Sequence, residues 1–384
     1  METAAGESSH DGLCEDVLVQ ILVRLPSESV LRCRAVCKSW RRITTDRAFL
    51  AAHAARRPRE MIVITESLTV SSIPLSLEDD TGRRRFLCDP TKRANDGSAT
   101  WCSLLYSLDG LLVLRQRPGL YIICNPITRQ WTNLPVLTPE PCFTAFPCGF
   151  YFHSSSGEYR LLCHGVAKDE DEAMGTVYIW YMKHDYYILS AGGTLPRLLG
   201  RASFPAVLPT IMGYERPTSH GGILHWFCSH PQATSTGKIL AFHTVSETFQ
   251  LMSRPPGVTI AALVEIDGAL SAATMPSPTR LDIWVLQDYE AESWTLRLRV
   301  EVSPPRRIRD SFVSMAISAG GGAILFGDPY CPVVRLCDLK EKGVRKEMYC
   351  RSAPLFLVFS ESLVSHAFFE SPRCPDLESI NFPD

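Results

Sequence analysis

The first sixty residues have the hydrophobic spacing of short amphipathic helices. Within residues 16–25, apolar side chains recur at three- and four-residue intervals, so they fall on one face of a helix. Pro26 ends this pattern, Ser27 is a suitable cap for a second helix, and residues 36–43 repeat the helical spacing. Three short helices cannot cover all of this apolar surface among themselves. An apolar face left exposed in this way predicts a protein partner.

After Pro58 the pattern changes to that of β-strands. Short runs rich in Val, Ile, Tyr, Trp and Phe alternate with Gly, Pro and Asp, as at residues 61–64, 111–114 and 222–227. No second helical region is evident in the pattern. The rest of the chain is therefore predicted to be nearly all β.

Two markers recur along this β region and indicate internal repeats. In the first, a glycine precedes an apolar run, and Gly222, Gly268 and Gly322 are 46 and 54 residues apart. Gly110 and Gly157 are further copies of this marker. In the second marker, a polar residue ends an apolar run and an aromatic residue starts the next run six positions later. Its copies are Asn125–Trp131, His243–Phe249 and Asp288–Trp294, with Asp338–Val344 as a weaker fourth.

A repeat of roughly 45 to 55 residues fits the four-stranded blade of a kelch-like β-propeller. At that period, the β region would hold about six or seven blades. The alternative is a β-sandwich built from unrelated hairpins. The predicted fold class is therefore α+β, with a small three-helix domain followed by a mostly antiparallel all-β domain, favoured as a propeller.

Composition and charge narrow the choice of partners and compartment. The chain has 384 residues, 45% of them hydrophobic, and a net charge of −2, which argues against a globally basic nucleic-acid binder. Residues 24–59 are locally basic, but a solvated helix face explains this better than nucleic acid does. The acidic N-terminal end and the lack of a long apolar run predict no signal peptide and no membrane span. We expect a soluble intracellular protein, in the cytoplasm, the nucleus or both.

The reactive residue types do not form a recognisable enzyme site. The fourteen cysteines are interpreted as reduced thiols, and for Cys33 and Cys37 small buried side chains are favoured over zinc ligands. The sequence holds no G-x-S-x-G, P-loop, G-x-G-x-x-G or H-E-x-x-H motif. Residues 320–322 are expected to be a turn between strands. We predict no catalytic residue, no cofactor and no metal.

Charged runs in the β region are interpreted as solvated loops. They comprise the acidic run at residues 169–172 and the arginines at residues 83–85 and 306–309. For the arginines, contact with a bound target is the alternative.

At its N-terminal end the chain resembles the F-box. The resemblance rests on residues 13–26, on Ser29-Val-Leu-Arg32, and on the highly specific string Val36-Cys-Lys-Ser-Trp40. It implies docking on an SKP-type adaptor, which links to a cullin scaffold and the ubiquitin-conjugating machinery. Carried onto this chain, the adaptor contacts are Leu13, Val17, Leu18, Ile21, Leu22, Leu25, Pro26, Leu31, Val36, Cys37, Trp40 and Ile43. We expect Trp40 to be the main anchor, with part of its surface in the core of the helices.

The β region is similar to the F-box-associated region of plant F-box proteins. The similarity is carried by residues 121–131 with the following Leu134-Pro135, and by residues 282–286 with Trp294. One departure concerns Cys14, where F-boxes usually have proline at the start of the first helix. Because proline presets φ there, we expect cysteine to weaken adaptor binding slightly.

The predicted organisation follows from these resemblances. Residues 1–10 are expected to be a disordered N-terminus, 11–57 the F-box and 58–384 the β domain. The function they imply is that of a non-catalytic substrate receptor in an SCF-type ubiquitin ligase, with an unknown target protein. The alternatives are an F-box protein acting outside ubiquitin ligation, and a ligand-binding propeller with an appended helical segment.

Overall fold

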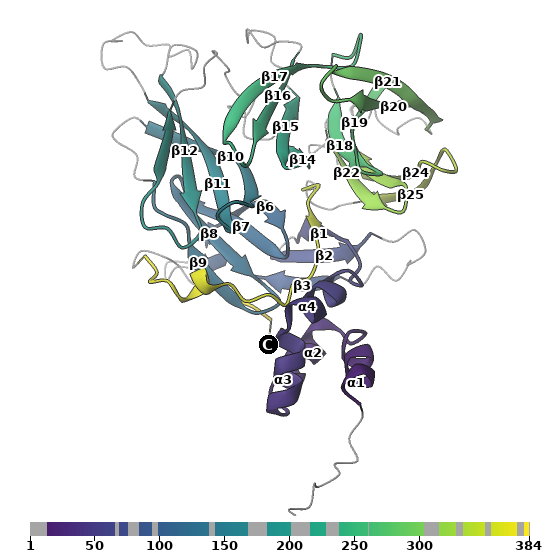
Figure 1. The fold of residues 1–384 in the computed structure, drawn as a ribbon. Helices are drawn as coiled ribbons and strands as arrows, with labels where there is room; N and C mark the ends of the chain where they lie inside the picture. The colour runs from purple at the N-terminus through teal and green to yellow at the C-terminus, as the bar shows by residue number, and fades with distance from the viewer. Residues whose placement is uncertain are drawn as a thin grey trace, which may run out of the picture.

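The computed structural model describes most of the chain. The described residues are 14–65, 69–75, 84–93, 99–137, 143–167, 183–200, 216–227, 238–259, 261–302, 315–327, 333–349, 355–374 and 380–383. Within them, four α-helices precede a ring of six four-stranded antiparallel sheets (Figure 1). The propeller prediction is confirmed with six blades, and the β-sandwich alternative is wrong.

Four helices, rather than the expected three, form the N-terminal domain. They are α1 (Glu15–Leu22), α2 (Ser27–Cys33), α3 (Lys38–Thr45) and α4 (Arg47–Ala54). The additional helix begins at Asp46, whose Oδ1 accepts hydrogen bonds from the backbone N–H of Ala48 at 2.9 Å and Phe49 at 3.2 Å. Such capping satisfies amide groups that have no partner within the helix.

Each blade is a meander whose first strand lies nearest the axis of the ring. Blade 1 comprises β26 (Val358–Phe359), β1 (Glu60–Ile64), β2 (Val70–Pro74) and β3 (Arg85–Cys88). Blade 2 comprises β6 (Ser103–Leu108), β7 (Leu111–Arg117), β8 (Leu120–Asn125) and β9 (Gln130–Asn133). Blade 3 comprises β10 (Phe143–His153), β11 (Glu158–Ala167), β12 (Lys183–Ser190) and β13 (Arg197–Gly200).

The other three blades repeat this order. Blade 4 comprises β14 (Thr218–His220), β15 (Ile223–Phe227), β16 (Lys238–His243) and β17 (Thr248–Ser253). Blade 5 comprises β18 (Ala262–Ile266), β19 (Ala269–Ser277), β20 (Arg280–Asp288) and β21 (Ser293–Glu301). Blade 6 comprises β22 (Met315–Gly320), β23 (Ala323–Gly327), β24 (Val333–Asp338) and β25 (Gly343–Tyr349). A separate two-stranded sheet pairs β4 (Thr91–Arg93) with β5 (Ala99–Trp101).

The ring is closed by its C-terminal strand. In blade 1, β26 pairs with β1, so that Glu60 lies opposite Phe359 and Met61 opposite Val358. Two segments almost 300 residues apart thus complete one sheet. Closure removes the open edge that the first blade would otherwise present along the ring axis.

The two sequence markers are two of the three hairpin turns of a blade. The glycine marker lies between the first two strands, where Asp109-Gly110 and Asp267-Gly268 have positive φ at both positions. This is the backbone of a type I′ turn, for which Asp-Gly is a favoured pair. The polar residue of the second marker begins the turn between the third and fourth strands of a blade. In each copy, the residue four positions after this polar residue has a positive φ. These residues are Arg129, Glu247, Glu292 and Lys342.

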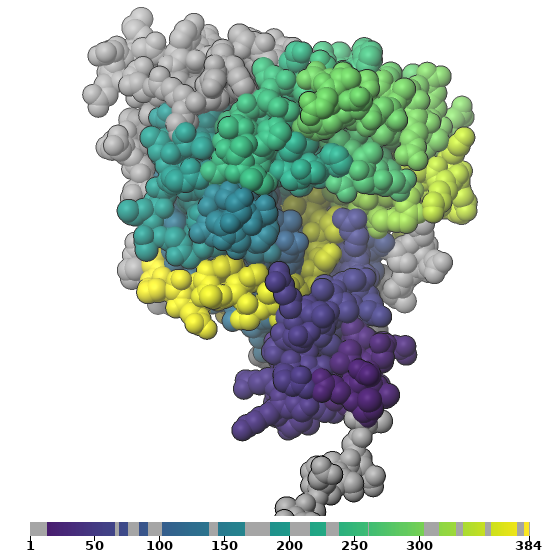
Figure 2. Space-filling view, in the orientation of Figure 1, coloured from purple at the N-terminus to yellow at the C-terminus, as the bar shows by residue number. Residues whose placement is uncertain are grey.

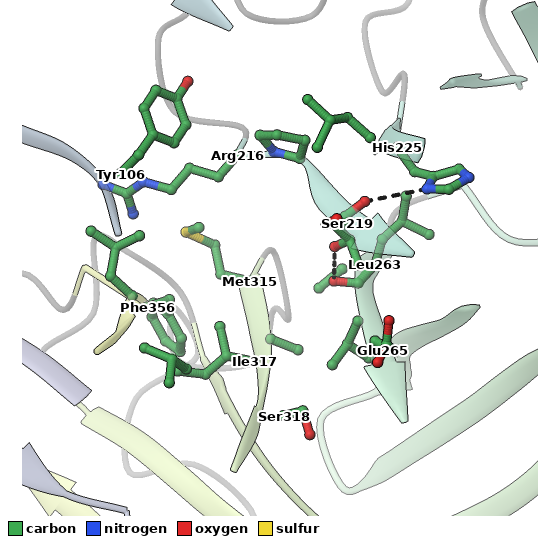
Figure 3. Close-up of a pocket in the computed structure, with 18 of the residues that line it drawn as sticks. Tyr106, Arg216, Ser219, His225, Leu263, Glu265, Met315, Ile317, Ser318 and Phe356 are labelled. Carbon is green, nitrogen blue, oxygen red and sulfur yellow. Dashed lines mark hydrogen bonds between the residues drawn. The ribbon is translucent and has the colours of Figure 1, made fainter. Parts of the chain in front are cut away.

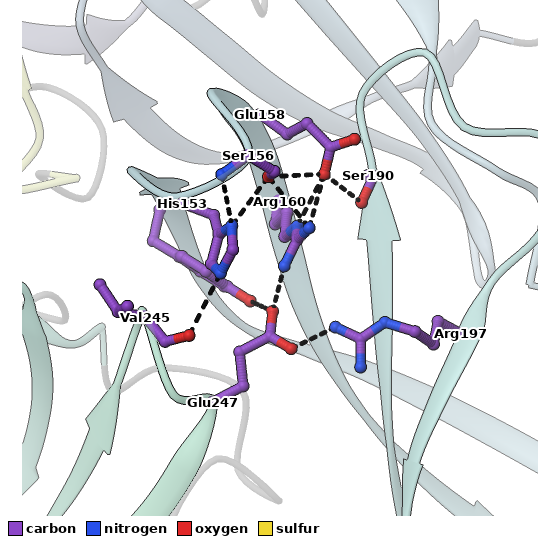
Figure 4. Close-up of polar contacts among 9 residues, drawn as sticks. His153, Ser156, Glu158, Arg160, Ser190, Arg197, Val245 and Glu247 are labelled. Carbon is purple, nitrogen blue, oxygen red and sulfur yellow. Dashed lines mark hydrogen bonds and ion pairs between the residues drawn. The ribbon is translucent and has the colours of Figure 1, made fainter.

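A polar network joins blades 3 and 4 across one pair of these turns (Figure 4). The partly buried carboxylate of Glu247 accepts hydrogen bonds from the Tyr151 hydroxyl at 2.8 Å and from Arg160 at 2.6 Å, and pairs with Arg197. Burial would raise the pKa of Glu247, but the hydrogen bonds from Tyr151, Arg197 and Arg160 hold it below its usual value. Because these partners are all in blade 3, the network fixes the angle between the two blades.

The helices and the propeller share one hydrophobic core. Leu22, Val30 and Ile43 of the helices are buried in the same cluster as Ile62 of β1 and Phe359 of β26. A buried cluster that spans both parts makes them pack as one unit. In Figures 1 and 2 the helices lie against one face of the ring, called the helix face below.

Polar contacts from the C-terminal segment, residues 355–374, reinforce this packing. The Glu361 carboxylate accepts a hydrogen bond from the Ser27 hydroxyl of α2 and pairs with Arg85 of β3. Arg85 also pairs with Glu28 of α2 at 3.0 Å. Arg34 donates to the backbone oxygen of Leu363 at 3.1 Å. The interpretation of Arg85 as a loop residue or target contact is therefore wrong, because its guanidinium joins the helices to the propeller.

The same segment crosses the helix face beneath blade 2. Asn125 donates to the backbone oxygens of Ser362 at 3.0 Å and Val364 at 3.3 Å. At Gly110, a Cβ atom would lie 2.3 Å from the Cβ of Ser362, which is far inside van der Waals contact. Glycine is required at this position both for its positive φ and for the close approach of the segment.

Removal of the Glu361 carboxylate should loosen the helices from the propeller. We expect Glu361→Ala to lower the free energy of unfolding by about 1–3 kcal/mol, because Arg85 and Ser27 lose their shared partner. Hydrogen exchange should become faster in α2, whereas the propeller strands should keep their protection. Glu370→Ala, at an exposed position of the same segment, is the control. Unchanged exchange in α2 would contradict this account.

A buried histidine should make stability depend on pH. His225 of β15 donates through Nδ1 to the Thr218 backbone oxygen at 3.2 Å and accepts from the Tyr289 hydroxyl at 2.9 Å. Burial lowers its pKa from 6.5 to about 4. Between these values the unfolded chain binds more protons, so stability falls as the pH is lowered from 6.5 toward 4.

The contribution of His225 across this window should be about 3 kcal/mol. Urea midpoints at pH 7.5 and 5 should therefore differ less for His225→Gln than for the unmodified protein. His243→Gln, which replaces a partly exposed histidine on β16, should keep most of the original difference, because burial and not the nearby His243 is the main cause of the lowered His225 pKa. Equal pH dependence in all three proteins would exclude His225 as its source.

Candidate functional site

The helical domain exposes apolar side chains on α1 and just before α3. Val17 and Ile21, four residues apart on α1, are 46% and 45% exposed, and Val36, just before α3, is 63% exposed. Figure 2 shows the helices projecting from the ring, so this part of the chain is accessible. Exposed aliphatic side chains on a helix and in the segment before another helix form a suitable surface for a protein partner.

The structure divides the predicted adaptor contacts into three groups. Exposed members are Val17, Ile21, Pro26, Val36 and Cys37. Partly buried members, packed against the shared core, are Leu18, Leu25, Leu31 and Trp40. Leu22 and Ile43 are buried inside that core, and Leu13 lies outside the described residues. The exposed group and the outer parts of the second group are thus the surface available in this conformation.

Trp40 lies in the first turn of α3 and belongs to both the core and the surface. Its backbone N–H donates to the Cys37 Sγ at 3.5 Å, which caps the helix. The indole is partly buried against the shared core. This agrees with the expectation that part of its surface is intramolecular.

The first helix begins without a side-chain cap. Cys14 is the N-cap of α1, its side chain makes no capping hydrogen bond, and its φ is −52°. That φ lies within the range that a proline ring imposes. The backbone therefore already has the conformation that proline would preset.

The structure tests the prediction for the glycine cluster at residues 320–322, but not those for two of the charged runs. Gly321 and Gly322 form the turn between β22 and β23, and Gly320 is the last residue of β22, so the predicted turn is confirmed. The acidic run at 169–172 and the arginines at 306–309 lie outside the described residues, so the structure says nothing of them. Among the described residues, no group of His, Cys, Asp or Glu is arranged to hold a metal ion. Within the same residues, no helix is long and apolar enough to cross a membrane.

A second candidate site is a cavity of about 370 Å³ in the centre of the propeller (Figure 3). The first strand of every blade contributes to its wall. Most of the lining is apolar, including Phe150, Leu263, Met315, Ile317 and Phe356. Volume and lining are typical of a site for a small molecule. Sequence patterns did not indicate it, since the lining residues are scattered over six blades.

Arg216 and Glu265 are charged groups on opposite sides of this cavity (Figure 3). The Arg216 guanidinium donates to the backbone oxygens of Leu105, at 2.8 Å, and Leu355. Desolvation lowers its pKa from 12.5 to about 10, so it stays charged at neutral pH. Glu265 is near His220, at 3.3 Å from carboxylate oxygen to Nδ1.

Comparison with known proteins agrees with both parts of the fold. A family model described as an F-box associated beta propeller domain matches residues 66–349, and an F-box-like model matches residues 13–55. An F-box protein of Arabidopsis thaliana is 26% identical over 300 residues, covering 73% of this chain and 77% of that protein. An F-box/LRR-repeat/kelch-repeat protein of the same plant is 24% identical over 293 residues, covering 71% and 73%.

Solved structures show a weaker likeness. A chain in the crystal structure of a nidogen/laminin complex is 11% identical and covers 78% of this chain and 96% of that chain, with a TM-score of 0.44. A likeness of this size carries no argument about function. The matches to the propeller and to the helices, by contrast, extend over most of the described residues. The chain belongs to the F-box associated beta propeller family and carries an F-box-like domain at its N-terminal end.

Proposed function

We propose that this protein is the substrate-recognition subunit of an SCF-type ubiquitin ligase, located in the cytoplasm, the nucleus or both. The helices bind an SKP-type adaptor that connects to a cullin, and the propeller binds a target protein. The observation that carries the proposal is the exposed apolar surface around Val17, Ile21 and Val36 on an F-box-like domain. The family supports a substrate-recognition role in general.

The proposed contribution of this chain to ubiquitin transfer is positional. Holding the target beside a charged conjugating enzyme converts an encounter between separate molecules into a reaction within one complex. The gain depends on a defined distance between adaptor and target. The shared core and the Glu361 contacts supply that definition, because they prevent the helices from turning freely against the propeller.

An alternative is an F-box protein that acts outside ubiquitin ligation. It shares the adaptor contact but would not require a cullin. Purification of this protein with its partners from the native source therefore distinguishes the two functions. Cullin should co-purify if the protein is a ligase receptor, and it should be absent if the protein acts outside ubiquitin ligation.

Charges placed in the exposed apolar surface should abolish adaptor binding. We expect Val17→Glu combined with Ile21→Glu to weaken binding to a purified SKP-type adaptor at least about 100-fold, because each charge would be buried unpaired at the interface. Calorimetric titration measures the change. Val245→Glu on the propeller, where the side chain is 53% exposed, is the matched control and should bind normally. Normal binding by the double variant would overturn the proposed adaptor surface.

A proline at position 14 should tighten the same interaction. Because α1 has no side-chain cap and its N-cap residue already has a compatible φ, Cys14→Pro should hold the start of α1 in its helical arrangement before the adaptor binds. The expected gain is about 0.4–1 kcal/mol, or a two- to five-fold lower Kd for the adaptor. Cys14→Ala should leave the Kd unchanged. An equal gain in both variants would show that loss of the thiol, and not the fixed φ, is responsible.

A further inference from the structure

The central cavity contains a positive charge that the described residues do not neutralise. Arg216 donates to two carbonyl oxygens, which leaves three of the five N–H donors of a guanidinium unused by these bonds. Carbonyl groups accept hydrogen bonds but carry no net charge. Among the described residues, no carboxylate forms an ion pair with Arg216. Charges that are largely removed from water are normally paired, and Arg216 is partly buried among apolar side chains, so an anion is the partner that this site would accept.

Three other polar groups on the wall already have partners. The Tyr106 hydroxyl donates to the Pro147 backbone oxygen at 3.0 Å, and the Thr218 hydroxyl donates to the Leu263 backbone oxygen at 2.8 Å. Both ring nitrogens of His225 are hydrogen-bonded. The cationic groups of the lining are Arg216 and Arg59. Arg59 is exposed to solvent, which screens its charge, so Arg216 is the cation that a ligand meets among mainly apolar side chains.

The geometry of the cavity limits the charge of the ligand. In Figure 3 the Arg216 side chain extends toward Tyr106, with Met315 and Phe356 beside it and Glu265 on the far side. The Arg216 guanidinium, which is less exposed than Arg59, compensates one negative charge, and the Glu265 carboxylate disfavours a second anionic group across the cavity. A monoanion with an apolar body fits these constraints better than a phosphate dianion.

We propose that the propeller cavity binds an amphipathic monocarboxylate, with its carboxylate on Arg216 and its apolar body against Phe356, Met315 and Leu263. A bidentate pair between guanidinium and carboxylate provides orientation, and the apolar wall provides most of the contact area. This site is independent of the adaptor surface, so failure of either proposal leaves the other standing.

The test uses the full chain and 3-phenylpropionate as the probe, with 3-phenylpropionamide as its uncharged counterpart. Calorimetric titration should give saturable binding of the carboxylate with a Kd of about 1 mM or below, and binding at least about ten-fold weaker for the amide. Inorganic phosphate should not compete with the carboxylate. Equal binding of amide and carboxylate, competition by phosphate, or no binding of the carboxylate would overturn the proposal.

Two variants locate the binding to the cavity. Arg216→Met removes the charge and should abolish the preference for carboxylate over amide. Because Arg216 also links Leu105 and Leu355, this variant can lose stability, so a second one leaves the guanidinium in place. Ser219→Phe fills the cavity from an exposed position of its wall and should abolish binding with little change in the melting temperature. Ser246→Phe, on an exposed turn, is its control. Binding that survives Ser219→Phe would place the probe elsewhere and refute the site.

The C-terminal end of a peptide is the alternative occupant of the cavity. A short N-acetylated peptide that ends in phenylalanine with a free carboxylate carries the same chemical groups on a longer chain. If this peptide binds and 3-phenylpropionate does not, the cavity recognises a polypeptide terminus, and the small-molecule proposal is wrong.

Discussion

Glu361 lies where three distant parts of the chain meet. Its carboxylate contacts Ser27 of the helical domain and Arg85 of blade 1, and it follows the closing strand β26 by two residues. The closure of the ring and the attachment of the helices therefore depend on one short segment. Buried carboxylates are costly unless each oxygen has a partner, and here the hydroxyl and the guanidinium supply them. A change that displaces this segment affects both the ring and the helices.

This arrangement connects the fold to the proposed function. A receptor that works by proximity needs a fixed spacing between its adaptor surface and its target surface. A flexible linker would permit many spacings, whereas α4 ends at Ala54 and β1 begins at Glu60, which leaves little chain between them. The core shared by Leu22, Ile62 and Phe359 then fixes the remaining freedom. Local packing, more than linker length, sets the position of the exposed apolar surface.

Sequence patterns predicted the parts of this structure that depend on local chemistry. Both repeat markers are hairpin turns, and turns such as Asp109-Gly110 are determined by the φ that their residues can adopt. The exposed surface around Val17 was likewise readable from helical spacing. The sequence did not reveal the fourth helix, although Asp46 is a normal cap. The Glu361–Arg85 pair and the cavity could not be predicted, because they join isolated residues across hundreds of positions without any periodic pattern.

The cavity and the closing segment are also physically linked. Arg216 donates to the backbone of Leu355, at the start of the stretch that contains both β26 and Glu361. A ligand on Arg216 would bind the closed ring and not the unfolded chain, and would stabilise closure by mass action. It would not by itself reorient the helices, since a ligand shifts an equilibrium only between states that it binds differently. The two sites therefore share a scaffold, and binding at the cavity favours the closed ring on which the placement of the helices depends.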